Sequence, residues 1–175
     1  MAYAVTHVIV AIVLIDIYRD YIARKKFPTW FVLVGGIAGL LPDIDVPLQW
    51  TASAIVGQTI ELHRIWTHSV ICVASFLLIA LFFHLQKHKT MVIFSRKLHY
   101  WKIALFFTVI AAGWMTHISL DCAVAGDYNL TWFPGFPLGF CPHPWSGDSL
   151  LGLDAIILVL WLVHEEWAHK IRDFI

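Results

Sequence analysis

Residues 103–121 read IALFFTVIAAGWMTHISLD, an apolar run that ends in a histidine and an aspartate. A helix that crosses a bilayer needs about 20 predominantly apolar residues. His117 and Asp121 are four residues apart, so a helix places both side chains on one face. This stretch therefore predicts a membrane helix that carries a polar pair at one end.

The rest of the chain is similarly apolar. Apolar residues make up 59% of it and charged residues 14%, whereas soluble domains average about 25% charged. We therefore expect an all-α integral membrane bundle of about five transmembrane helices in a single domain, residues 1–175. The second stretch is short and stops at Pro42, so we expect a half-helix or a tilted helix there. The five apolar stretches are 2–18, 28–41, 68–86, 103–121 and 150–164.

The basic residues predict how the chain is oriented. Eleven of the 12 Lys and Arg residues fall within 19–26, 87–102 and 170–172. With five spans these segments share one side, which the positive-inside rule makes cytoplasmic. The N-terminus and the loops 42–67 and 122–149 then face outward. We expect a multi-pass protein of the inner or plasma membrane, with Arg64 as the one outward basic residue.

This topology gathers histidines and aspartates from distant segments at the outer face. Zinc takes three or four protein ligands, so this set fits two metals with a bridging carboxylate, or one metal whose ligands are held by the remaining residues. We expect one to three divalent ions, zinc first, with manganese as the alternative because oxygen and nitrogen ligands are mixed. The candidate ligands are His7, Asp43, Asp45, His63, His68, His117 and Asp121.

The order of these motifs carries a family resemblance. Thr6-His7, Pro42-Asp43-Ile44-Asp45, HRIWTHS at 63–69 and His117 with Asp121 follow one another along the chain. Over roughly residues 1–125 this order resembles the inner-membrane, metal-dependent hydrolases grouped with the zinc-dependent phospholipase C superfamily. The resemblance implies a multi-metal hydrolase that acts on phosphoesters, with the seven candidates at its metal-site positions. It does not name a substrate.

The expected reaction begins with a metal-activated water. Asp43 or Asp45 would act as general base, and Arg64 would bind the phosphoryl oxygens and stabilise developing charge. Thr67 and Ser69 are expected to bind phosphate or orient a ligand.

The segment 122–149 is rich in aromatic residues and proline, so we expect a lid on the outer lipid surface that admits a lipid head group. Asp148 and Asp154 would help to position the substrate. Cys122 and Cys141 both map outside, where oxidation is possible. We expect a disulfide between them, with two free thiols as the alternative.

Three other functions fit parts of the pattern. A b-type haem protein would use His68 and His117 as axial ligands, a divalent-metal transporter would place ligands near the bilayer midplane, and metal-free lipid phosphatases share the His-x-x-x-Asp ending. The expected partners are the bilayer and a lipid or phosphoester; a net charge of zero gives no case for nucleic acid. The sequence leaves the oligomeric state open. His164 is expected to be solvated or to contact lipid head groups, and Asp16 to pair with Arg19 or Arg24.

Overall fold

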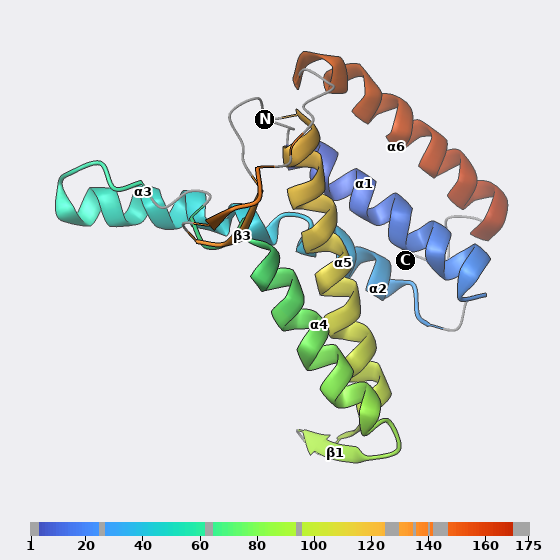
Figure 1. Cartoon of the computed structure of the whole chain (residues 1–175). Coiled ribbons are helices and arrows are strands. Elements are labelled where there is room, and N and C mark those ends of the chain that lie inside the picture. The colour runs from blue at the N-terminus through green and yellow to red at the C-terminus, as the bar shows by residue number, and fades with distance from the viewer. Residues whose placement is uncertain are drawn as a thin grey trace.

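Helices make up most of the chain in the computed structural model (Figure 1). Helix α1 (Ala4–Ile17) continues through a π-helical turn (Tyr18–Ile22) and is followed by α2 (Trp30–Ala38). A 3-10 turn (Leu41–Ile44) leads directly into α3 (Asp45–Val56). The structure describes residues 4–24, 27–61, 65–93, 96–124, 130–134, 136–139, 141 and 147–169.

The second half of the chain contains the longest helices. Helix α4 (Val70–Leu85) and helix α5 (Tyr100–Val124) are joined by an antiparallel hairpin of β1 (Thr90–Ile93) and β2 (Arg96–His99). A second short hairpin, β3 (Thr131–Phe133) with β4 (Phe136–Pro137), precedes α6 (Gly147–His169).

Helix α5 is the central element of the fold. It packs against α4, α2 and α1, whereas α6 packs against the outer side of α1 and α3 projects away from the other helices (Figure 1). Large side chains such as Ile110, Trp114 and Ile118 of α5 are buried against Ala38 and Val73. The ends of α1, α4 and α5 that lie away from the β1–β2 hairpin are thereby brought together.

Glycines allow the helix backbones to approach one another closely. A methyl group at Gly113 of α5 would collide with the carbonyl of Gly35 and lie 2.8 Å from the Cβ of Ala38, both in α2. A methyl group at Gly39, just after α2, would lie 2.8 Å from the carbonyl of His7 in α1. Small residues at helix contacts permit such close packing in membrane proteins.

Each of the five apolar stretches contains a helix, but the segment 42–67 is not a simple loop as expected. It contains α3, which begins at Asp45 and ends before Gly57, a glycine with a φ of 72°. Pro47 lies in the first turn of α3, where a missing N–H costs no helical hydrogen bond. Polar residues interrupt this helix, so its sequence lacks the long apolar run by which the other helices were identified.

Length and composition alone mark few of these helices as membrane spans. In the described ranges α5 is long and apolar enough to cross a bilayer, and Trp30–Ala38 with Leu41–Val56 would qualify as one pair bent by 51°.

Gly113→Ala tests the close packing of α5 on α2. Alanine is a better helix former than glycine by about 1 kcal/mol, so without the contact this change would stabilise the protein. We expect it instead to lower the free energy of unfolding by about 1–3 kcal/mol, because the added methyl overpacks the interface. Thermal unfolding in detergent measures the effect, with Ala112→Leu at the exposed neighbouring position as the control. A stabilised Gly113→Ala variant would contradict the packing.

Candidate metal centre

Five side chains from four segments meet where α1, α4 and α5 converge. His7 comes from α1, Asp43 from the 3-10 turn after α2, His68 from the residues just before α4, and His117 and Asp121 from the last turns of α5. Of these side chains all but that of Asp43 are buried, and the Asp43 side chain is 32% exposed. Groups of these residues bring their ligand atoms within 4.8 Å of one another and could hold a metal ion.

Five separations among four donor atoms are close to the edges of a tetrahedron. His68 Nε2 lies 3.2 Å from His117 Nε2, and Asp43 Oδ1 lies 3.5 Å from the first and 3.4 Å from the second. Asp121 Oδ2 lies 3.4 Å from His68 Nε2 and 3.7 Å from His117 Nε2. A tetrahedron with metal–ligand bonds of about 2.0–2.1 Å has edges of about 3.3–3.4 Å. Most of these separations exceed the roughly 2.7–3.2 Å of a good hydrogen bond, so they suit a shared cation better than direct pairing.

The hydrogen bonds of the two imidazoles decide which of their nitrogens carries a proton. His117 Nδ1 lies 2.7 Å from the carbonyl oxygen of Gly39. A carbonyl only accepts, so Nδ1 must donate, and Nε2 of a neutral ring then carries a lone pair. The Thr67 hydroxyl donates to Asp45 Oδ2 and lies 3.0 Å from His68 Nδ1, from which it can accept. In their neutral forms both Nε2 atoms therefore present lone pairs to each other and to two carboxylates.

Such an arrangement requires positive charge at its centre. Without a metal ion, a proton on His68 can supply this positive charge. Burial of His68 disfavours the charged ring, but the carboxylates of Asp121 and Asp43 outweigh that penalty and raise the pKa of this histidine. A divalent cation between the four donors would meet the same need, with every lone pair directed at it.

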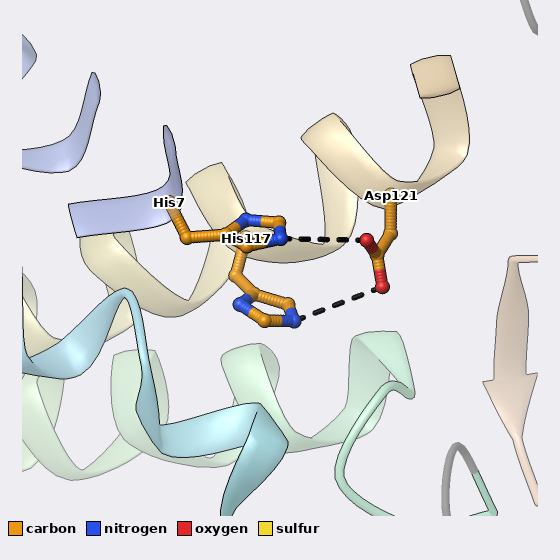
Figure 2. A group of neighbouring side chains, drawn as sticks. All are labelled: His7, His117 and Asp121. Carbon is orange, nitrogen blue, oxygen red and sulfur yellow. Dashed lines mark ion pairs between the residues drawn. The ribbon is translucent and has the colours of Figure 1, made fainter. Parts of the chain in front are cut away.

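The fifth side chain, His7, approaches the other oxygen of Asp121. Figure 2 shows His7 and His117 facing the two oxygens of this carboxylate, and His7 Nε2 lies 3.4 Å from Oδ1. The two imidazole rings stack with their centroids 3.8 Å apart. The Nδ1 atom of His7 is buried without a hydrogen-bond partner in the described part of the chain. His7 Nε2 and this oxygen of Asp121 would be available to hold a further ion.

A local break in the chain aims His117 at the site. Helix α2 ends before Pro42, which has no N–H to donate. The N–H of Asp43, which a continuing helix would direct to Gly39, donates to the carbonyl of Leu40 instead. The Gly39 carbonyl is thereby left for His117. This backbone acceptor was not anticipated from the sequence, although the glycine followed by a proline marked the end of the helix.

Trp114 is a second positioning residue that was not anticipated. Its indole nitrogen donates to the carbonyl of Thr67 at 2.7 Å and so ties the residues before α4 to α5. It precedes His117 by three residues, a spacing that places both side chains on one helix face.

Several expected site residues lie beside the donor group, not within it. Asp45 approaches His68 from the Nδ1 edge at 3.6 Å, opposite the Nε2 edge that faces the other ligands. The hydroxyl of Thr67 contacts Asp45 and His68, while that of Ser69 donates to the carbonyl of Trp66 at 2.7 Å. The remaining expected residues lie outside the described part: the whole of His63 and Arg64, and the side chains of Asp148 and Asp154.

The second hairpin is tied to the same end of the bundle. The disulfide expected between Cys122 and Cys141 is present, and Cys122 directly follows the ligand Asp121. Thr131 of β3 pairs with Ser69, and Phe133 packs edge-on against Trp66 with ring centroids 5.8 Å apart. The described residues of the expected lid therefore lie beside the residues that precede α4.

Comparison with protein-family models identifies the family of this chain. Residues 1–172 match the family model described as YdjM inner membrane protein. The chain belongs to the YdjM inner membrane protein family. It is therefore an inner-membrane protein, and the His/Asp groups described above belong to a YdjM-family chain. No curated protein and no solved structure matches it.

Elemental analysis of the detergent-purified protein tests the metal centre. We expect about one to two divalent ions per chain, as sites with a bridging carboxylate hold, and a loss of at least one ion in His68→Ala and in Asp121→Ala. His88→Ala, which removes an exposed histidine after α4, is the matched control and should retain the wild-type content. A wild-type protein that stays free of metal after reconstitution would contradict the centre.

The Asp45→Asn variant tests whether Asp45 binds the metal directly or only orients the ligand His68. Because Asp45 contacts the far edge of His68, this change should weaken metal affinity by about 10–100-fold and leave the bound amount at saturation unchanged. Competition with a chromophoric chelator measures the affinity. Full loss of one ion at saturation would instead make Asp45 a direct ligand.

Proposed function

We propose that this protein is a metal-dependent membrane hydrolase that cleaves a phosphoester, phospholipid-like substrate at the non-cytoplasmic membrane surface. The observation that carries the proposal is the set of four buried or half-buried donor atoms whose lone pairs converge at 3.2–3.7 Å. The order of motifs that resembles metal-dependent hydrolases supports the same reading.

Zinc is the proposed metal. Imidazole nitrogens and carboxylate oxygens are its usual non-sulfur ligands, and it favours four-coordinate sites. The spacing of the donors is that of a tetrahedron, whereas an octahedral ion with bonds of about 2.0–2.1 Å, such as magnesium, would require shorter edges. Manganese remains the alternative because half of the donors are oxygens.

The chemistry of the site follows from which ligand reaches solvent. A cation held by His68, His117 and Asp121 would keep its fourth position for a water, which it would activate for attack at neutral pH. Asp43, whose side chain is 32% exposed, is the most exposed donor of the group and would accept the proton of that water. His68 and His117 are fully buried and fixed at both ring nitrogens, so they serve to hold the ion. Arg64 is proposed to bind the phosphoryl oxygens.

The arrangement of charged residues supports a multi-pass protein with this site on the outer face. The basic hairpin β1–β2 lies at one end of α5 and His117 lies seventeen residues beyond Tyr100, about 26 Å along the helix. That length approaches the roughly 30 Å hydrocarbon core of a bilayer. Helices α4 and α6 expose Leu78, Phe82, Leu160 and Val163, which a bilayer would cover. A disulfide at the other end of α5 suits an oxidising compartment.

The hairpin β3–β4 supports a substrate at the membrane surface. Trp132 is 52% exposed and Phe136 66% exposed, close to the tether at Cys141. Exposed aromatic side chains favour the membrane–water interface. A site bordered by such residues would receive a lipid head group from the bilayer more readily than a large soluble polymer.

The geometry argues against the haem alternative. Axial ligands on opposite sides of an iron, each at about 2.0 Å, would place their nitrogens about 4 Å apart with the porphyrin plane between them. His68 Nε2 and His117 Nε2 are 3.2 Å apart with two carboxylates beside them. The transport alternative is less favoured because these ligands lie toward the helix ends and away from the midplane.

An assay on the metal-loaded protein tests the hydrolase. We expect it to cleave bis(p-nitrophenyl) phosphate or to release head groups from phospholipid vesicles, and we expect EDTA to abolish and zinc to restore that activity. Asp43→Asn should lower the rate by about 10²–10⁴-fold through loss of the general base, whereas His88→Ala should match the wild type. Activity that survives chelation would point to a metal-free lipid phosphatase. A metal-loaded protein inactive on both substrate classes would overturn the phosphoester hydrolase.

A further inference from the structure

A second polar cluster is buried between α1 and α6, outside the metal centre. Asp16 of α1 and Glu165 of α6 are each 1% exposed, and His164 lies between them. His164 Nδ1 is 3.2 Å from Glu165 Oε1 and 3.7 Å from Asp16 Oδ2. These three residues form a group whose ligand atoms all lie within 4.8 Å of one another. The sequence had suggested a solvated histidine here, and an aspartate paired with arginine.

The two carboxylates are not fully satisfied by their neighbours. Asp16 Oδ1 and Glu165 Oε2 are buried without a hydrogen-bond partner among the described residues. Trp161 donates to the other oxygen of Asp16 at 3.3 Å. Arg19 donates to the carbonyl of Phe27 and pairs with Asp20 at 2.8 Å. Two buried carboxylates with open oxygens beside an imidazole call for a positive charge.

The histidine can present the nitrogen that a cation would need. His164 Nδ1 donates to Glu165 Oε1 at 3.2 Å, because a carboxylate oxygen only accepts. A cation in place of that proton would leave Nε2 to donate to the hydroxyl oxygen of Tyr21, 3.3 Å away. Imidazole nitrogens and carboxylate oxygens are ligand types that divalent ions such as zinc and manganese bind. A cavity of about 330 Å³, lined in part by Asp16, Tyr21 and His164, lies beside the cluster.

This cluster is separate from the first centre. Asp16 follows His7 by nine residues, which is about 14 Å along α1 and half a turn around it. His7 therefore faces α5, while Asp16 faces α6 on the opposite side of the same helix, as the arrangement in Figure 1 requires.

We infer that Asp16, His164 and Glu165 form a second divalent-cation site that holds α6 against α1. In the described part of the chain α1 is the main packing partner of α6. A cation bound by one residue of α1 and two of α6 would link the two helices. This inference stands apart from the proposed hydrolase, because none of its residues belongs to the first centre.

Zinc titration of the purified full chain tests the second site. Glu165→Gln and Asp16→Asn should each bind about one zinc ion fewer per chain than wild type at saturation. Glu166→Gln removes a neighbouring exposed carboxylate and should bind the wild-type amount. In a chain with His68→Ala and His117→Ala, one zinc ion should remain and disappear when Glu165→Gln is added. The comparison of Glu165→Gln and Asp16→Asn with the wild type does not depend on whether the chain with both His68→Ala and His117→Ala folds.

A second readout follows the helix contact. Zinc should raise the thermal unfolding midpoint of the wild type and of Glu166→Gln by the same amount, and by a smaller amount in Glu165→Gln. Equal zinc content in Glu165→Gln and Glu166→Gln would overturn the site. The cluster would then hold a shared proton, and Glu165→Gln would stabilise the metal-free protein. Loss of hydrolase activity with the second zinc ion still bound would affect only the proposed function.

Discussion

The structure depends on a buried group of nitrogen and oxygen atoms whose lone pairs face one another. His68 and His117 each use Nδ1 for a bond to the surrounding protein and turn Nε2 toward two carboxylates. Nothing in that donor set balances its own charge, so the site is stable only with a proton or a metal ion at its centre. The family assignment places this requirement in an inner-membrane protein.

The close packing of the helices and the geometry of the ligands have the same origin. Gly113 lets α5 lie directly on the backbone of α2, and the end of α2 at Gly39 releases a carbonyl that fixes His117. Pro42 ends the helix and brings Asp43 to the donors within one 3-10 turn. Gly35 of α2 thus contributes to helix contact, and Gly39, just after α2, contributes to ligand orientation through its backbone carbonyl.

The sequence predicts most of the fold and part of the site, for reasons that particular residues make clear. Apolar runs identify helices because burial in lipid demands them, but α3, with Gln49, Thr51 and Ser53, has no such run. The charge pattern brings His7, His68 and Asp121 to one end, and the structure places them in contact. The charge pattern does not predict which of Asp43 and Asp45 faces the other donor atoms. Two residues apart in a helical turn point about 200–240° from each other, so one faces the donors and the other the back of His68. Buried pairs such as Asp16 and Glu165 escape sequence patterns because their proximity depends on how α6 docks.

The spread of the ligands along the chain has a consequence for biogenesis. His7 belongs to α1, which leaves the ribosome before α5, whereas Asp121 belongs to the last turn of α5. Partial chains that contain α1 to α4 bring imidazoles and one carboxylate into the bilayer without the aspartate that joins them. Binding of a cation by the complete donor set would therefore require α5, so it would be a late event in the folding of the chain.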